Sequence, residues 1–117
     1  MKPRGFVPGR GDLVWLSFDP PTAHEQQGRR PALVLSPAAY NRKVGLALVC
    51  PVTSRQKGYP FEVALPPGMP VGGVILADHV RSVDWRSRRA AWICTLPDDV
   101  THDALDRLGA LLDPAQG

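Results

Sequence analysis

The sequence predicts a mainly β fold that is completed by one C-terminal helix. Three observations indicate this class. The 117 residues include 13 Pro and 11 Gly, too many for a helical bundle. Short apolar runs alternate with turn residues along most of the chain. Only the C-terminal stretch has a helical period. The length suits one domain over residues 1–117, with the Pro-, Gly- and Arg-rich residues 1–10 as a flexible arm.

Six or seven short runs have the composition of strands, and we expect mostly antiparallel pairing among them. Residues 37–43 are expected to be a connection that includes a single turn at 39–41. Residues 19–31 (DPPTAHEQQGRRP) are polar and have no period, which indicates a long loop of a length that is often functional. The expected strands are 13–18, 32–36, 46–53, 61–65, 74–77, 80–85 and 91–95.

The apolar residues of the last segment fit one face of a helix that ends before Pro114. Asp98 and Asp99 favour its N-terminus through capping and through the helix dipole. Asp103 and Arg107 have the i, i+4 spacing of a stabilising ion pair. The residues that share the apolar face are Val100, Leu105, Leu108, Leu111 and Leu112.

Charge is distributed unevenly along the chain. Residues 1–58 carry nine basic and three acidic side chains, whereas residues 59–117 carry five and eight. Eleven of the fourteen basic residues are arginine, which binds phosphate through two parallel hydrogen bonds. The basic half is therefore either a solvated face or the binding surface of a polyanion such as nucleic acid.

The cysteines and the apolar runs indicate in which compartment of the cell the protein is located. Cys50 and Cys94 lie in apolar runs and have no CxxC or CxxH spacing, so we expect two free thiols in a reducing compartment and no metal site. No apolar run approaches the length of a membrane span, and the N-terminus lacks the apolar segment of a signal peptide. A cytoplasmic protein that does not enter the membrane is expected.

Polar residues that could carry chemistry stand at the ends of apolar runs, where a rigid sheet can hold a loop residue in place. Together they suit metal-free cleavage of RNA, in which the 2′-hydroxyl attacks the neighbouring phosphate. Each also has a structural alternative, because such residues often cap a turn or solvate a strand end. The candidates are Glu25, Arg29 and Arg30 on the long loop, Thr53 and Ser54, and Asp78 and His79.

The chemistry divides among these candidates by side-chain type. Glu25 is a carboxylate that can accept the proton of the 2′-hydroxyl, and Arg30 can hold the phosphate. Thr53 and Ser54 can donate hydrogen bonds to a phosphate oxygen. His79 can serve as an acid or read a base. The three tryptophans are expected in the core, although an exposed one would be able to stack on a base.

Several blocks of sequence, in this order and spacing, resemble the MazF/PemK family of type II toxins over about residues 9–112. The blocks are GDLVW at 11–15, FDP at 18–20, EQQGRRPALVLS at 25–36, YN at 40–41, PVTS at 51–54, KGYPFEV at 57–63 and ADHVRSVDW at 77–85. The resemblance implies a small SH3-like barrel of the MazF, Kid and CcdB type. It also implies a sequence-specific endoribonuclease that cleaves single-stranded RNA and mRNA without metal or other cofactor, leaving 2′,3′-cyclic phosphate and 5′-hydroxyl ends.

Carried over position by position, the family's catalytic arginine falls on Arg30, its catalytic Thr or Ser on Thr53 and its acidic residue on Glu25. The family's common Gln in the ADQV motif is His79 here, and the loop PPGMPVGG at 66–73 departs from the family in its Pro and Gly content. Residues expected to contact RNA are Arg29, Ser54, Arg55, Lys57, His79, Arg81 and Arg86.

The resemblance also implies partners. These are a second copy of the chain in a homodimer and a MazE-like antitoxin with an acidic C-terminal tail, which neutralises a toxin that inhibits translation and growth. DNA would be contacted only indirectly, through the antitoxin complex. Two alternatives stand beside this function. One is a non-enzymatic gyrase poison like CcdB, although the chain ends in LLDPAQG without a terminal aromatic residue. The other is an inactive SH3-like interaction module.

Overall fold

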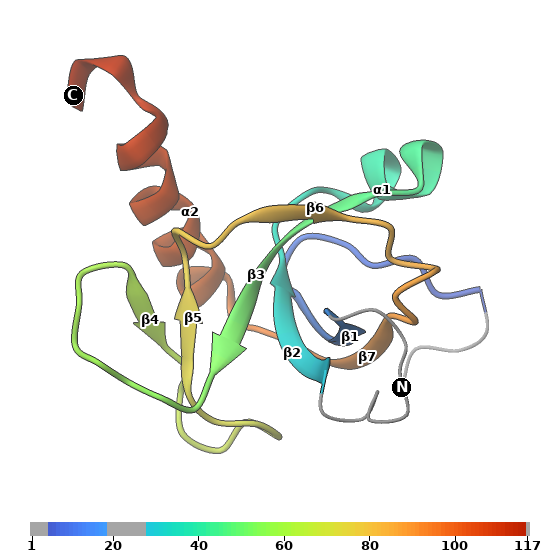
Figure 1. The fold of residues 1–117 in the computed structure, drawn as a ribbon, viewed down its shortest axis with the longest axis horizontal. Helices are drawn as coiled ribbons and strands as arrows, with labels where there is room; N and C mark the ends of the chain where they lie inside the picture. The colour runs from blue at the N-terminus through green and yellow to red at the C-terminus, as the bar shows by residue number, and fades with distance from the viewer. Residues whose placement is uncertain (1–4, 19–27, 117) are drawn as a thin grey trace.

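The computed structural model describes residues 5–18 and 28–116, which form a curved antiparallel sheet with two helices (Figure 1). All seven expected strands are present. In chain order the elements are β1 (Asp12–Ser17), β2 (Arg29–Val34), α1 (Ala38–Val44), β3 (Ala47–Thr53), β4 (Glu62–Ala64), β5 (Val74–Leu76), β6 (Arg81–Val83), β7 (Ala91–Thr95), α2 (Asp98–Leu112) and a short 3-10 turn (Pro114–Gln116).

Strand β3 joins the two parts of the sheet. The strand order is β4-β5-β3-β2-β1-β7, every pair is antiparallel, and β6 also pairs with β3. Ala47–Val49 of β3 pair with β6, whereas Val52 and Thr53 at its other end pair with β5. Within the described residues this pairing does not close on itself. The mainly β fold with a terminal helix is confirmed, and the expected barrel is an open, curved sheet.

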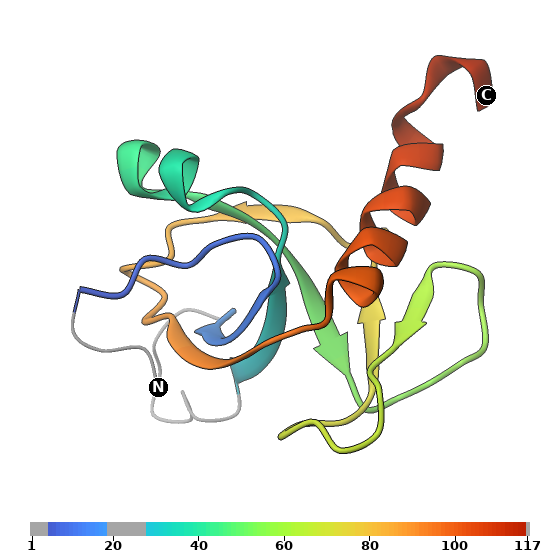
Figure 2. The same ribbon diagram turned by 180° about the vertical axis from the view of Figure 1, so that it is seen from behind.

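The central strands bury both of their faces, which explains why their sequences read as unbroken apolar runs. Leu13, Leu33 and Cys50 belong to one core cluster, against which α2 packs Leu105 and Leu108. Figure 2 shows α2 crossing this side of the sheet, with its C-terminal end directed away from it. The alternate residues of the same strands form a second cluster on the other face with Val83 of β6 and the following Trp85; these strand residues are Val14, Leu16, Ala32, Val34, Ala47 and Val49.

Helix α1 is longer than the expected single turn at 39–41. It spans seven residues and ends at Gly45, which has the left-handed backbone conformation with φ of 80°. Asn41 lies inside the helix and is fully buried. Its amide donates to the backbone carbonyls of Pro8 and Ser36, at 2.7 and 3.0 Å, and its oxygen accepts from the Ser36 hydroxyl. These tertiary hydrogen bonds stabilise a helix that its own sequence does not signal.

The N-terminal segment is packed against the sheet from Phe6 onward, in contrast to the flexible arm expected over residues 1–10. Phe6 and Val7 pack against the second core cluster, and Pro8 is buried. The carbonyl of Pro8 is one of the acceptors of the Asn41 amide. Residues 5–10 therefore contribute to the core, because their apolar side chains cover the face that α2 leaves open.

Helix α2 agrees with its prediction except at its start. Pro97, rather than an aspartate, occupies the N-cap position and makes no side-chain cap, while the Asp99 carboxylate accepts from the Val100 backbone N–H of the first turn at 3.0 Å. Both acids lie in the first turn, where they favour the positive end of the helix dipole. Arg107 and Asp103 form the expected ion pair, with Nε 2.8 Å from Oδ1. No helix of the described residues is long and apolar enough to cross a membrane.

Both cysteines are free, as expected, and their burial differs. Cys50 is buried and Cys94 is partly buried. Burial, assisted by the charge of Asp78, raises the pKa of the Cys50 thiol to about 12. Burial and Asp12 also raise the pKa of Cys94. Among the tryptophans, Trp85 is in the core and Trp92 is partly buried, whereas Trp15 is 37% exposed and does not fit the core prediction.

Candidate active-site groove

Strand register brings Arg30 and Thr53 to one face of the sheet. The last pair of the β2–β3 ladder is Ala32 with Pro51, and Arg30 and Thr53 each lie two residues beyond that pair, at the end where the ladder has stopped. Opposite residues of an antiparallel pair project to the same face. Arg30 is part of β2 because this strand starts at Arg29, three residues before the expected strand, where it pairs with β1 through Leu16 and Ser17. Residues 23 positions apart in sequence thus become neighbours.

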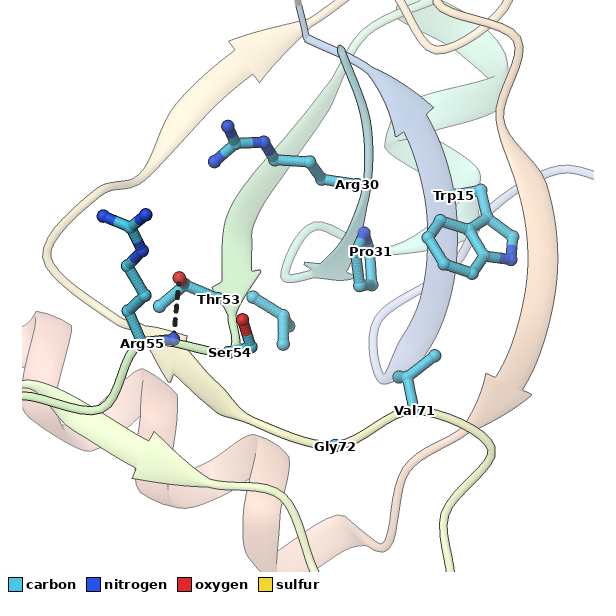
Figure 3. A pocket seen from close by; sticks show the side chains of 9 residues that line it. Trp15, Arg30, Pro31, Thr53, Ser54, Arg55, Val71 and Gly72 are labelled. Atoms are coloured by element: carbon cyan, nitrogen blue, oxygen red, sulfur yellow. Dashed lines mark hydrogen bonds between the residues drawn. The ribbon is translucent and has the colours of Figure 1, made fainter. Parts of the chain in front are cut away.

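A cavity of about 650 Å³ opens over this pair (Figure 3). In Figure 3 the Arg30 side chain extends from β2 in the direction of β3 and Arg55, while Trp15 and Val71 stand on the opposite side. Trp15 comes from β1, and the loop after Leu65 supplies the rim at Val71 and Gly72. The lining residues are Trp15, Arg30, Pro31, Val52, Thr53, Ser54, Arg55, Val71 and Gly72.

The Thr53 hydroxyl is oriented by the chain that follows it. Its oxygen accepts a hydrogen bond of 3.2 Å from the Arg55 backbone N–H. A hydroxyl that accepts at its oxygen still has its proton to donate. On the other side, Gly73 lies against the Thr53 carbonyl with φ of 118°, and a Cβ at Gly73 would overlap that oxygen. The glycine therefore lets the 66–73 loop approach β3 and form the rim of the cavity.

A second cavity of about 380 Å³ continues from the first and shares Thr53 and Arg55 with it. We refer to the two cavities together as the groove. The second cavity is lined by Thr53, Arg55, Lys57, Tyr59, Glu62, Leu76, Asp78 and His79. The Tyr59 hydroxyl donates to Asp78 at 2.9 Å, and the exposed His79 places Nε2 3.8 Å from the same carboxylate oxygen. Burial and the hydrogen bond to Asp78 raise the pKa of Tyr59.

The groove brings together most, but not all, of the residues that the sequence singled out. Arg30, Thr53, Ser54 and Arg55 line the first cavity, and Lys57 and His79 line the second. Glu25 lies outside the described residues.

Three expected RNA contacts line neither cavity. Arg29 donates to the Ser17 hydroxyl at 3.1 Å and to the Arg89 carbonyl at 2.9 Å, and burial together with the charge of Arg89 lowers its pKa. The guanidinium of Arg81 lies 5.1 Å from the centre of the Phe18 ring, and that of Arg86 lies 4.8 Å from the centre of the Trp85 ring. These three arginines contact residues at the ends of β1, β6 and β7.

Two aromatic residues of the groove were not assigned to it from the sequence. Trp15 is exposed on β1 although its neighbours on both sides are buried. The residues around it form an apolar run without alternating polar residues, so the sequence does not indicate that it is exposed. Tyr59 lies in a loop, and only the tertiary contact with Asp78 reveals its place. Within residues 5–18 and 28–116, no group of three His, Cys, Asp or Glu side chains could hold a metal ion.

Comparison with known proteins decides the family. Residues 9–112 match the sequence profile of the family described as "PemK-like, MazF-like toxin of type II toxin-antitoxin system". The chain belongs to this family. Among curated PemK/MazF proteins, the endoribonuclease toxin MazF of Escherichia coli K12 is 54% identical over 85 residues, which cover 73% of this chain and 76% of that protein. The endoribonuclease toxin ChpB of the same strain is 42% identical over 110 residues, covering 89% and 93%.

Solved structures of the family have the same fold. A crystal structure of MazF from Deinococcus radiodurans is 62% identical and superposes with a TM-score of 0.84, covering 92% of this chain and 97% of that one. A MazE–MazF crystal structure from the same organism matches at 58% identity and a TM-score of 0.82, covering 92% and 96%. The mainly antiparallel sheet with a C-terminal helix is therefore the architecture of MazF proteins.

Proposed function

We propose that the groove cleaves single-stranded RNA, including mRNA, at specific sequences and without a metal ion, so that the protein is an endoribonuclease toxin. The observation that carries the proposal is that Arg30 and Thr53, on neighbouring strands, line the same open cavity. The membership in the PemK/MazF family supports it, and so do the relatives named as endoribonucleases. Neither a gyrase poison nor an inactive module requires this pair.

In the proposed reaction the 2′-hydroxyl of the RNA attacks the adjacent phosphorus, and the bond from phosphorus to the 5′-oxygen breaks. The products are a 2′,3′-cyclic phosphate and a 5′-hydroxyl. The Arg30 guanidinium donates to two phosphate oxygens, which stabilises the negative charge that develops on them. The Thr53 hydroxyl, whose oxygen already accepts from the Arg55 backbone N–H, donates a hydrogen bond to a phosphate oxygen. Glu25 takes the proton of the 2′-hydroxyl, and the departing 5′-oxygen takes a proton from solvent water, which makes it the 5′-hydroxyl of the product.

The second cavity holds the RNA next to the cleaved phosphate. Arg55 and Lys57 supply positive charge along it, together with Ser54 at its junction with the first cavity. His79 and the Asp78 carboxylate present donors and acceptors that can read a base edge. Trp15 offers a half-exposed ring at the other end of the groove, on which a base can stack.

The toxin acts as a homodimer in the cytoplasm, where cleavage of mRNA stops translation and growth. Exposed apolar residues support the dimer. Tyr40 and Leu48 line one cavity together with Leu105 and Leu108 of α2, and Val44, Leu111 and Leu112 are also exposed. An antitoxin with an acidic tail neutralises the protein by covering the cationic groove. The MazE–MazF structures among the similar proteins support a partner of the antitoxin class. Contact with DNA is made only through that complex.

The test is to map the ends that the purified protein produces on a long transcribed RNA. We expect cuts at one short sequence, 5′-hydroxyl ends and 2′,3′-cyclic phosphates. Excess EDTA should leave the rate unchanged. Random cuts, or activity that EDTA removes and a divalent ion restores, would overturn the metal-free mechanism. An RNA that stays intact with protein shown to be folded would overturn the function itself.

A further inference from the structure

Arg107 connects the C-terminal helix to one wall of the second cavity. The wall is the loop from Lys57 to Phe61, which leads into β4. The Arg107 guanidinium donates to the backbone carbonyl of Pro60, and its Nη1 lies 3.4 Å from the carbonyl of Glu62. Arg107 lines neither cavity, so it does not contact a molecule bound in the groove.

Asp103 holds the guanidinium in the orientation that these contacts need. Asp103 lies one helical turn before Arg107, and its carboxylate accepts from the Arg107 Nε at 2.8 Å and from Nη2 at 3.4 Å. Two contacts from the same carboxylate fix the plane of a guanidinium. The remaining nitrogen, Nη1, then points to the loop. The Asp103–Arg107 ion pair is part-exposed, so it orients the guanidinium and contributes little to the stability of the fold.

Few other side-chain hydrogen bonds hold the 57–61 wall in place. The Glu62 carboxylate accepts from the backbone N–H groups of Lys57 and Gly58, at 2.9 and 2.8 Å. The Tyr59 hydroxyl is bound to Asp78. Glu62 and Tyr59, which make these hydrogen bonds, also line the second cavity, so bound RNA competes for their side chains. The Phe61 carbonyl at the end of the wall also accepts from the backbone N–H of buried Ala77, at 2.9 Å. Among these side-chain contacts of the wall, the one from Arg107 comes from a residue that lines neither cavity.

We propose that Arg107, oriented by Asp103, is a positioning residue that holds the 57–61 wall in the shape that binds RNA. This role rests on the function proposed above. When the wall is not held, its residues must be ordered at the moment of binding, and ordering costs affinity. The Arg30–Thr53 pair lies on other strands and is not disturbed. Loss of Arg107 therefore raises KM and leaves kcat nearly unchanged.

The experiment compares Arg107→Met and Arg107→Lys with the unaltered chain on a transcribed RNA whose cut sites have been mapped. Methionine keeps the aliphatic stem on the helix and removes every donor, whereas lysine keeps a charged donor. We expect Arg107→Met to raise KM about tenfold with kcat within about twofold, and Arg107→Lys to restore part of the loss. Backbone amide exchange at Lys57 and Gly58 should quicken in Arg107→Met.

Asp106→Asn is the matched control, since Asp106 is an exposed acid on the same helix, and it should match the unaltered chain in both measurements. If Arg107→Met does not fold, Asp103→Asn takes its place under the same criteria. An unchanged KM, or a fall in kcat with KM constant, would refute the positioning role. A failure of the proposed function looks different, because the unaltered chain itself would then leave RNA intact.

Discussion

Arg30 on β2 and Thr53 on β3 line the same cavity, two residues beyond the last pair of the ladder between these strands, Ala32 with Pro51. A cation and a hydroxyl therefore share one face of a rigid sheet and open into the same cavity. Neither side chain needs a flexible loop to reach the other. The arrangement suits a reaction in which a phosphate must be held while charge develops on it.

Arg30→Ala should abolish detectable RNA cleavage while the protein stays folded. Removal of one donor to a developing oxyanion typically costs about 10²–10³-fold in rate. Single-turnover cleavage and circular dichroism of the same preparation measure the two properties. Arg42→Ala removes an exposed arginine of α1 that lines neither cavity, so it should cleave normally. Full activity in a folded Arg30→Ala protein would contradict the phosphate-holding role.

Thr53→Val should lose most of the cleavage rate, and Thr53→Ser should keep most of it. Valine retains the β-branched shape at the end of β3 but has no hydroxyl, whereas serine retains the hydroxyl. The two variants therefore separate the chemical group from its packing. Initial rates on the same RNA compare them. Equal rates for the valine variant and the unaltered protein would show that the hydroxyl takes no part.

His79→Gln should stay active and change the preferred cut sequence. The exposed imidazole lines the second cavity rather than the Arg30–Thr53 cavity, so it is placed to read a base. Sequencing of cut ends from a mixed RNA pool gives the preference of each protein. An inactive His79→Gln would instead make His79 a proton carrier, and an unchanged preference would remove it from base reading.

The native Cys50 thiol should resist alkylation at pH 8, and unfolding should expose it to reaction. Burial raises its pKa from an ordinary value of 9.0 to about 12, so almost none of it is the reactive thiolate at pH 8. The unfolded chain releases the proton above pH 9, which the folded chain does not. The free energy of unfolding should therefore fall by about 1.4 kcal/mol for each pH unit between 9 and 12. Denaturant titrations of Cys50→Ala should show a shallower fall.

Asn41→Ala should lower the free energy of unfolding by about 2–3 kcal/mol, because it leaves the carbonyls of Pro8 and Ser36 without their donor and the Ser36 hydroxyl without its acceptor. Urea denaturation measures the change. Arg42→Ala, at the next and exposed position of α1, is expected to shift it by less than about 0.5 kcal/mol. A similar loss in both variants would mean that α1 is stabilised by helix propensity alone.

Much of the fold could be predicted because local patterns carry it. The apolar runs located every strand, and the period of residues 98–112 located α2 together with its Asp103–Arg107 pair. The length of α1 was missed, since a buried Asn41 reads as a turn residue until its partners in the N-terminal segment are known. The early start of β2 was missed for the same reason: its first residues are polar and become a strand by pairing with β1.

By itself, the sequence determined the class of fold, the order of its elements, the family, and the candidates Arg30 and Thr53, because these follow from composition, period and recognisable blocks. The tertiary structure alone decided which arginines line the groove and which contact strand ends. Arg29 is of the second kind, because it donates to the Ser17 hydroxyl and to the Arg89 carbonyl. It also decided that Trp15 and Tyr59 line the groove. These outcomes depend on strand register and on contacts between distant segments, which no local pattern encodes.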